Sequence, residues 1–181
     1  MTASRHPSRL NRRSLLLAGV AGAAAVGISA VFKPFARNAA ANEGDFEFTL
    51  SKAEWKKRLS DEQFAVLREE ATERAFTSPL NKNYAEGLYN CAGCDLPVYS
   101  SETKYDSGTG WPSFWDSLPD AIGTKADNSL FMRRTEVHCR RCGGHFGHIF
   151  DDGPEPTGKR HCLNGVALTF VPASGGAATA G

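Results

Sequence analysis

Beyond its first 41 residues, the sequence has fewer basic than acidic side chains. Its 181 residues carry 21 lysines and arginines against 20 aspartates and glutamates. Six of the basic residues fall within residues 1–41, which contain no acidic residue, so the rest of the chain carries 15 basic against 20 acidic side chains. Proteins that bind nucleic acid usually concentrate lysine and arginine in basic patches. The balance therefore argues against a nucleic-acid partner.

The chain also lacks long hydrophobic runs, with one exception of about 18 residues near its start, which is mostly alanine and glycine. That length is at the lower limit for spanning a bilayer. The run follows Arg12-Arg13 and precedes the small residues 39–41. This order is typical of an export signal, and adjacent arginines indicate the twin-arginine route. We predict a signal over residues 1–41, cleaved after Ala41, and an exported, periplasmic protein. An uncleaved membrane anchor is the alternative.

Internal repeats and long linkers are absent apart from a repeated Cys-x-x-Cys pair, so residues 42–172 are predicted to form one domain. Ser51 and Ser60 each stand three residues before Glu or Gln, the capping-box pattern of a helix start. From residue 79 onward, glycine and proline separate short apolar runs, which indicates antiparallel strands. The predicted strands are residues 87–89, 97–99, 130–133, 136–138, 148–150 and 166–171. Residues 173–181 are small and polar and are predicted to be disordered.

Cysteine is scarce, and its count of five is odd, which excludes a framework made of disulfides alone. Four of the five form the two pairs Cys91-x-x-Cys94 and Cys139-x-x-Cys142. Each pair is a tight knuckle that can direct two sulfurs at one ion, and two knuckles complete a tetrahedral zinc site. Such a site is closed, so its predicted role is structural. Two disulfides, or a ligand set that includes His138 or His145, are the alternatives.

The fifth cysteine, Cys162, has no partner in this scheme. On a strand, Arg160 and Asn164 share its face because alternate residues point the same way. A neighbouring arginine lowers the pKa of a thiol and raises its thiolate fraction. His145 or His148 is a candidate general acid if their loop covers the thiol. The alternatives are that the histidines support the metal ligands from behind, and that Cys162 is a small buried side chain.

Two other functional classes compete with thiol chemistry. A zinc-containing binding module would use Trp111, presented by the glycine-rich turn 106–114, as a pocket wall, although this tryptophan is equally suited to a core. Such a module has no use for an unpaired Cys162. A zinc hydrolase built on His145 and His148 needs an open metal position and an acidic base, and the sequence offers neither once four cysteines close the site.

Several segments resemble peptide-methionine (R)-S-oxide reductases, the B-type methionine sulfoxide reductases. They are Gly-Thr-Gly-Trp-Pro-Ser-Phe (108–114), the run 139–154, Gly-Lys-Arg-His-Cys-Leu-Asn (158–164), and parts of 55–76 and 89–94. The likeness extends over about residues 48–172. It implies a mainly β fold of two antiparallel sheets, β-tent-like, with short N-terminal helices and a structural zinc held by the two cysteine knuckles.

The resemblance also implies an active site. Cys162 matches the family's nucleophile, and Trp111 matches the residue that cradles the S-methyl group of the substrate, with Phe150 assigned to substrate binding beside it. The active-site polar shell is matched by His145, His148, Arg160 and Asn164. The implied reaction reduces the R epimer of methionine sulfoxide, mainly in oxidised proteins or peptides, through a sulfenic acid on Cys162.

One position departs from a common family pattern. Many members carry a second, resolving cysteine where Thr109 stands, and the other four cysteines here are assigned to zinc. The sulfenic acid is therefore expected to be reduced by an external thiol, either thioredoxin-like or part of a membrane thiol relay. Nothing in the sequence calls for an oligomer, and a monomer is expected.

Overall fold

The computed structural model describes residues 46–129 and 133–173. The predicted signal over residues 1–41, residues 174–181 of the predicted tail and residues 130–132 of one predicted strand lie outside the described residues. Within the described part of the chain, no helix combines the length and the apolar character needed to cross a membrane.

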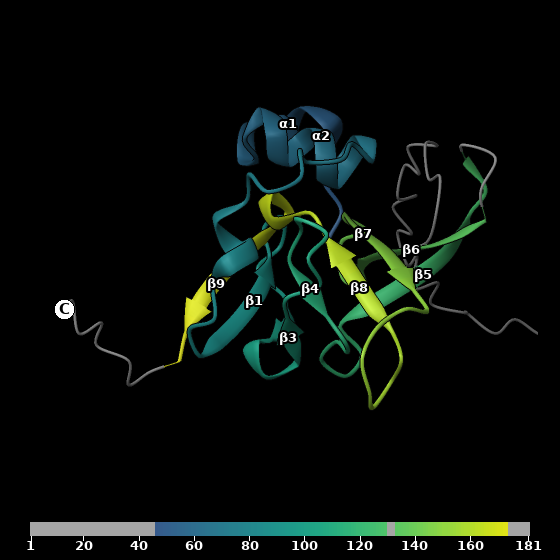
Figure 1. Cartoon of the computed structure of the whole chain (residues 1–181). Helices are drawn as coiled ribbons and strands as arrows, with labels where there is room; N and C mark the ends of the chain where they lie inside the picture. Colours follow the sequence, from purple (N-terminus) through teal and green to yellow (C-terminus); the bar gives the residue numbers. More distant parts are fainter. Residues whose placement is uncertain (1–45, 130–132, 174–181) are drawn as a thin grey trace, which may run out of the picture. The chain divides into compact units, whose positions relative to one another are not determined.

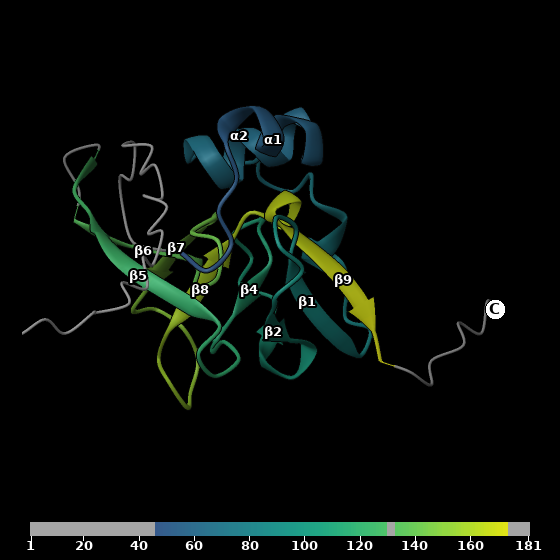
Figure 2. The same ribbon diagram turned by 180° about the vertical axis from the view of Figure 1, so that it is seen from behind.

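Two short helices begin where the capping pattern predicts. They are α1 (Lys52–Arg58) and α2 (Asp61–Glu69). In each, the hydroxyl of the capping serine accepts a hydrogen bond from a backbone N–H of the first turn, and the Glu or Gln side chain accepts one from the serine N–H. Trp55, Phe64 and Leu67 are buried beneath them. Figures 1 and 2 show both helices at the same end of the strands.

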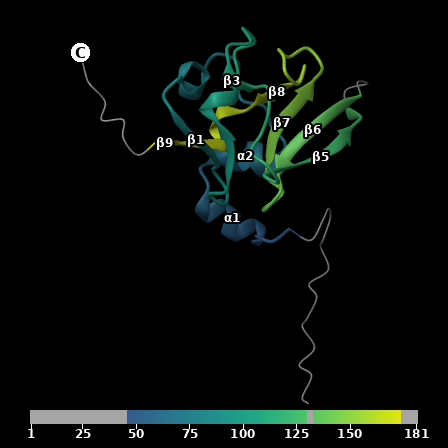
Figure 3. The same ribbon diagram turned by 90° about the horizontal axis from the view of Figure 1, so that it is seen from below.

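The rest of the described chain forms two antiparallel sheets, which confirms the predicted fold class (Figure 3). The three-stranded sheet has the order β2 (Pro97–Ser100), β1 (Gly87–Cys91), β9 (Leu168–Pro172). The six-stranded sheet has the order β3 (Lys104–Tyr105), β4 (Ser113–Phe114), β8 (Arg160–Leu163), β7 (His145–Phe150), β6 (Arg134–Cys139), β5 (Ile122–Asp127). Short 3₁₀ turns lie at η1 (Pro79–Lys82), η2 (Ser101–Thr103) and η4 (Gly165–Ala167).

Several predicted strand boundaries are wrong, and two of them lie close to Cys162. The strand predicted over 166–171 begins only at Leu168, because residues 165–167 form the turn η4, which carries the chain from the six-stranded to the three-stranded sheet. The strand predicted over 148–150 begins at His145, because its first half is buried on both sides and lacks the alternating pattern of a half-exposed strand.

The core lies between the sheets and is rich in aromatic side chains. Phe114 of the six-stranded sheet packs against Tyr89 and Tyr99 of the three-stranded sheet, with ring centroids 5.0 and 4.6 Å apart. All three are fully buried, as are Phe146 and Leu163. Aromatic pairs contribute beyond the area they bury, so this contact holds one sheet against the other close to the strand that carries Cys162.

Candidate active site and metal centre

Four buried cysteines meet where the two sheets come together. Cys91 ends β1 and Cys94 lies in the turn after it, whereas Cys139 ends β6 and Cys142 lies in the turn that follows. Their four sulfurs lie within 4.8 Å of one another, with Cys91–Cys142 at 3.7 Å and Cys94–Cys139 at 3.6 Å. Each sheet thus contributes one knuckle to a single cluster.

The geometry fits a metal ion and does not fit disulfides. Zinc bonds to sulfur at about 2.3 Å, which separates tetrahedral ligands by about 3.8 Å, whereas a disulfide needs about 2.05 Å. Hydrogen bonding with the neighbouring sulfurs of Cys139, Cys142 and Cys94, together with burial, raises the pKa of Cys91 far above its usual range. The separations match those of ligands on one ion, and the cluster is a candidate metal centre.

The alternative histidine ligands lie elsewhere. Within the described residues, the metal-competent group contains the four cysteines and neither His138 nor His145. His145 instead donates from Nδ1 to a carboxylate oxygen of Glu136, 2.9 Å away. Arg58 and Arg68 of the helices donate to the carbonyl oxygens of Gly93 and Cys142, at 2.7 and 2.9 Å. The helices are thereby fixed to both knuckles.

Cys162 lies within the six-stranded sheet, outside the metal cluster. It stands directly opposite Ser113 of β4 on one side and His148 of β7 on the other. Direct cross-strand partners share a face, with Cβ atoms about 4.5–5.5 Å apart. Arg160, two residues before Cys162, is opposite Phe150 in the same way. The register therefore brings a thiol, an imidazole and an aromatic ring to one face.

These side chains line a small pocket of about 160 Å³. The pocket contains five of the predicted site residues: Trp111, His148, Phe150, Cys162 and Asn164. His145 and Arg160 are not among its lining residues. The ring of His145 lies 5.5 Å from that of His148, and Arg160 lies over Phe150 at 4.4 Å while it binds both carboxylate oxygens of Asp152 at 2.8 Å.

The expectation that Arg160 leaves Cys162 with a lowered pKa is wrong. Burial raises the pKa of Cys162 above its usual value of 9.0. The Thr109 hydroxyl, 3.8 Å from the sulfur, and the Arg160 guanidinium both act in the opposite direction, but burial outweighs them. The loss of hydration destabilises the Cys162 thiolate by more than the Thr109 and Arg160 contacts stabilise it. Cys162 is therefore held as a thiol.

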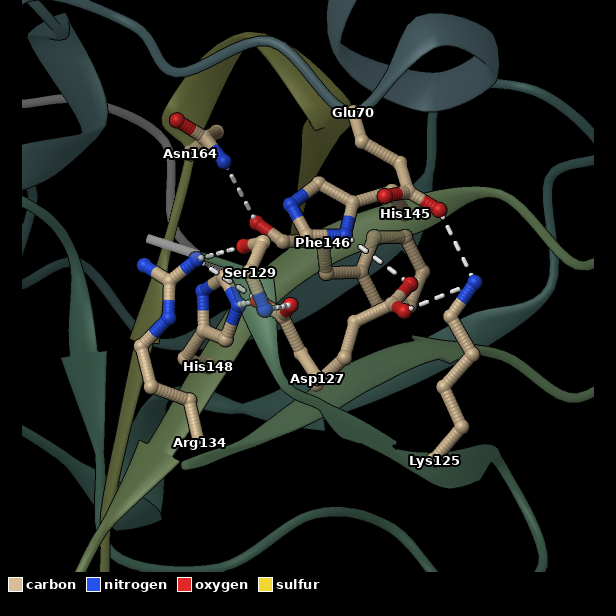
Figure 4. A network of polar contacts seen from close by, with 10 residues as sticks. Glu70, Lys125, Asp127, Ser129, Arg134, His145, Phe146, His148 and Asn164 are labelled. Atoms are coloured by element: carbon tan, nitrogen blue, oxygen red, sulfur yellow. Dashed lines mark hydrogen bonds and ion pairs between the residues drawn. The ribbon is translucent and has the colours of Figure 1, made fainter. Parts of the chain in front are cut away.

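His148 is fixed by a carboxylate that two other groups hold in place (Figure 4). Its Nε2 lies 2.8 Å from Oδ2 of Asp127, and that same oxygen accepts a hydrogen bond from Arg134 at 2.6 Å. The backbone N–H of Ser129 donates to Oδ1 of Asp127 at 2.8 Å, and these bonds lower the carboxyl pKa well below its usual range. Because Asp127 is ionised, Nε2 of His148 carries the hydrogen, and Nδ1 is the nitrogen that can exchange a proton.

His145 belongs to a second, more deeply buried network. Its side chain is 4% exposed, and the Glu136 that it contacts also binds Lys125 at 3.0 Å, which in turn binds Glu70 at 2.8 Å. Burial lowers the pKa of His145 to about 4. Burial also lowers the pKa of His148, although its bond to Asp127 acts in the opposite direction. Both imidazoles are therefore neutral at neutral pH.

The segment after α2 fixes two walls of the pocket through Glu73. The Glu73 carbonyl accepts from Nε1 of Trp111 at 2.9 Å, and its N–H donates to Oδ1 of Asn164 at 2.8 Å. Asn164 also donates from Nδ2 to the carbonyl of Phe146 at 2.9 Å. Trp111 is therefore a pocket wall held by a hydrogen bond rather than a core residue, and Asn164 is held at both ends of its amide.

Sequence reasoning missed Thr72 and Arg134, which line the pocket, and Asp127, which holds His148. Thr72 lies 90 residues from Cys162 along the chain, and no local pattern connects them. Asp127 and Arg134 flank a short connection between β5 and β6, and they are themselves cross-strand partners. No hairpin is predicted over these residues, since β5 is not among the predicted strands, so the sequence carries no signal for this pair.

The structure is mainly β and combines a buried four-cysteine candidate metal centre with a separate pocket built around a thiol and an imidazole. The comparisons place a protein of this architecture among the oxidoreductases. Residues 59–172 match the SelR domain family. The chain belongs to this family, that of peptide methionine sulfoxide reductase B.

Named relatives agree with this assignment. A peptide methionine sulfoxide reductase MsrB of Methanosarcina barkeri is 54% identical over 121 residues, which cover 66% of this chain and 85% of that protein. The MsrB of Leptospira interrogans is 49% identical over 127 residues, covering 70% and 97%. Among solved structures, the Mis18 "Yippee-like" domain gives a TM-score of 0.41 at 14% identity, covering 49% of this chain and 98% of that one, a likeness too weak to bear on function.

Proposed function

We propose that this protein reduces the R epimer of methionine sulfoxide, mainly in oxidised proteins, and that Cys162 is the nucleophile. The observation that carries the proposal is the direct cross-strand pairing of Cys162 with His148 inside the pocket walled by Trp111. The reaction needs a thiol that can take the oxidising equivalent and a group that protonates the departing oxygen. The pairing supplies both on one face of the sheet.

The opposite pKa shifts of the two groups suggest where the proton comes from. Cys162 is held as a thiol and His148 as a neutral imidazole in the free protein. Transfer of the thiol proton to Nδ1 of His148 creates the attacking thiolate and the acid together. Asp127, already ionised, stabilises the imidazolium that forms. We assign the general acid to His148 rather than to His145, which is more deeply buried and outside the pocket lining.

The chemical balance is simple. The Cys162 thiolate attacks the sulfoxide sulfur while the imidazolium protonates the sulfoxide oxygen. The hydroxyl group then passes to Sγ of Cys162 as the transient S–S bond and the substrate S–O bond break, which leaves a sulfenic acid and releases methionine. Cysteine sulfur rises by two oxidation levels and methionine sulfur falls by two. Arg160 and Asn164 assist by stabilising the thiolate and by keeping the pocket wall in place. Trp111 and Phe150 enclose the methyl group of the substrate.

Recycling of the enzyme is assigned to an external thiol. On the glycine-rich turn, the Thr109 hydroxyl lies 3.8 Å from the sulfur of Cys162, and a hydroxyl cannot form a disulfide. Two equivalents of a thiol, or one dithiol, reduce the sulfenic acid to the thiol and release water. A disulfide between Cys162 and one of the other four cysteines, isolated during turnover with thiol limiting, would contradict this assignment.

The metal is assigned as zinc with a structural role. Four cysteine sulfurs in closed tetrahedral geometry are the donor set that zinc takes in structural sites. When bound, the ion supplies charge compensation for four thiolates and a fixed link between the knuckles. Elemental analysis of the purified, folded protein that finds another metal, or none, would refute the assignment.

The test of function compares epimers and a variant. The metal-loaded protein is given dithiothreitol and, separately, peptides that contain methionine-R-sulfoxide or methionine-S-sulfoxide. Turnover of the R peptide alone, abolished in Cys162→Ser with an unchanged circular dichroism spectrum and metal content, is the expected result. A folded, metal-loaded protein that turns over neither epimer would sink the proposal and favour a binding module.

A further inference from the structure

A second, much larger depression adjoins the Cys162 pocket. It has a volume of about 900 Å³ and lies between α2, the segment 71–80 and the chain from η4 into β9. Gln63, Val66, Arg74, Leu80, Val166 and Phe170 are among the residues that line it. We call it the α2–η4 groove. Figure 1 shows the two elements that define it, α2 and η4, next to each other at one end of the sheets.

The groove and the pocket share a wall. Thr72 lines both, and Asn164 of the pocket is followed directly by Gly165 of the groove. Glu73 ties the two sides together: its carbonyl holds Trp111, and its carboxylate accepts from the N–H groups of Gly165 and Val166 at 2.7 and 3.4 Å. The two linings are thus continuous at Thr72, and the Glu73 contacts hold that shared wall in place.

The two volumes suit different parts of one ligand. Sites for whole small molecules measure roughly 300–1,000 Å³. The Cys162 pocket, at about 160 Å³, lies below this range and is suited to a single side chain, whereas the groove lies within it. A methionine sulfoxide residue in a protein brings its polypeptide with it, and that polypeptide has to continue beyond the pocket.

One positively charged side chain in the groove is available to a ligand. The side chains of Arg58, Arg68 and Arg134 each donate to a named oxygen, and so do those of Arg140, Arg141 and Arg160. Arg74, which is exposed, has no carboxylate partner among the residues that the structure describes. Its guanidinium presents a planar set of donors that matches a carboxylate.

From this continuity, and resting on the proposed function, we infer that the α2–η4 groove binds the polypeptide on one side of the methionine sulfoxide, with Arg74 pairing to an acidic side chain of that flank. The groove is thus a specificity subsite for protein substrates. It makes no contribution to the reduction of a free or blocked amino acid, which fills the pocket alone.

The test uses a series of peptides that contain methionine-R-sulfoxide in an alanine background. A single Glu or Lys is placed at each position up to about three residues on either side. For the wild-type protein we expect one position, on one flank, at which the Glu peptide has a KM roughly two- to five-fold lower than the Lys peptide, the range of an exposed ion pair. Arg74→Glu is expected to reverse this preference, with kcat unchanged.

Two controls show whether the preference belongs to the groove. Lys57→Glu on α1 changes the net charge of the protein equally and lies outside the groove lining, so it should leave the Glu/Lys ratio as in the wild type. N-acetyl-methionine-R-sulfoxide amide should be reduced equally by wild type and Arg74→Glu. A preference that is absent, or that Lys57→Glu alters as much as Arg74→Glu, overturns the inference. Failure of the wild type on every sulfoxide would instead overturn the proposed function.

Discussion

At the scale of single residues, the state of Cys162 has a consequence for its reactivity. Burial raises the pKa of this thiol, which means that the thiolate is lost as pH falls through a value above 9.0. We therefore predict that the rate of Cys162 alkylation by iodoacetamide rises about tenfold per pH unit from pH 7 upward, because the thiolate is the nucleophile. Arg160→Ala should move the midpoint higher still, since Arg160 favours the thiolate.

Mass spectrometry of the labelled peptide provides the measurement, and Cys162→Ser provides the blank. The four metal-site cysteines should remain unlabelled while the ion is bound. An alkylation midpoint below the ordinary value for a thiol would show that the partners of Cys162 outweigh burial, contrary to this expectation.

The two histidines should separate cleanly in mutagenesis. His148→Gln removes the proposed acid from the pocket, and we predict a loss of about 10²–10⁴-fold in kcat/KM, the usual contribution of a general acid. His145→Gln disturbs a buried pair with Glu136 and should lower mainly the free energy of unfolding. Steady-state kinetics and urea unfolding of each variant make the comparison. Equal losses of turnover in two stably folded variants would reject the assignment to His148.

At the scale of elements, the placement of Cys162 depends on how closely β7 approaches β8. A Cβ on Gly147 would lie 2.1 Å from the carbonyl oxygen of Cys162, a distance that only a shift of the strands can relieve. We predict that Gly147→Ala lowers kcat/KM at least about tenfold, because a misplacement near 1 Å can cost that much or more. Gly158→Ala, in the connection between β7 and β8, meets no neighbouring atom but lies at a φ of +68°, so it should lower stability while costing little activity. If Gly147→Ala had the kcat/KM of the wild type, the placement of Cys162 would not depend on the close approach of β7 to β8.

The elements also show what the sequence could and could not reveal. The helix starts at Ser51 and Ser60 follow from patterns only a few residues long, whereas β8, the strand that carries Cys162, is not among the predicted strands. The four metal ligands followed from spacing together with the chemistry of zinc. Thr72 and Asp127 did not follow, because their roles depend on contacts with chain segments more than 20 residues away. The direction of the Cys162 pKa shift was misjudged because burial cannot be weighed from neighbours in sequence.

At the scale of the whole molecule, the metal centre joins the two sheets. One knuckle belongs to β1 of the three-stranded sheet and the other to β6 of the six-stranded sheet. We predict that Cys94→Ser loses the metal and lowers the free energy of unfolding by more than about 4 kcal/mol, as loss of a structural metal typically does. Cys162→Ser, which changes the same atom outside the cluster, should retain both metal and stability. Metal analysis and urea unfolding of both variants test this prediction. A metal-free Cys94→Ser protein as stable as the wild type would show that the metal does not hold the two sheets together.

The position of β8 and β9 at the end of the described chain affects how the protein folds during its synthesis. These are the last two strands of the described chain, and each completes a different sheet: β8 between β4 and β7, and β9 beside β1. Until β8 has been synthesised, the edges of β4 and β7 with which it pairs remain unpaired. Unpaired strand edges are templates for association with other chains. A nascent chain halted before residue 160 already holds the four clustered cysteines but lacks Cys162, the proposed nucleophile, and presents open edges on both sheets. Interrupted translation should consequently yield an aggregation-prone species with no partial activity, and the competent enzyme arises only when the final strands are inserted.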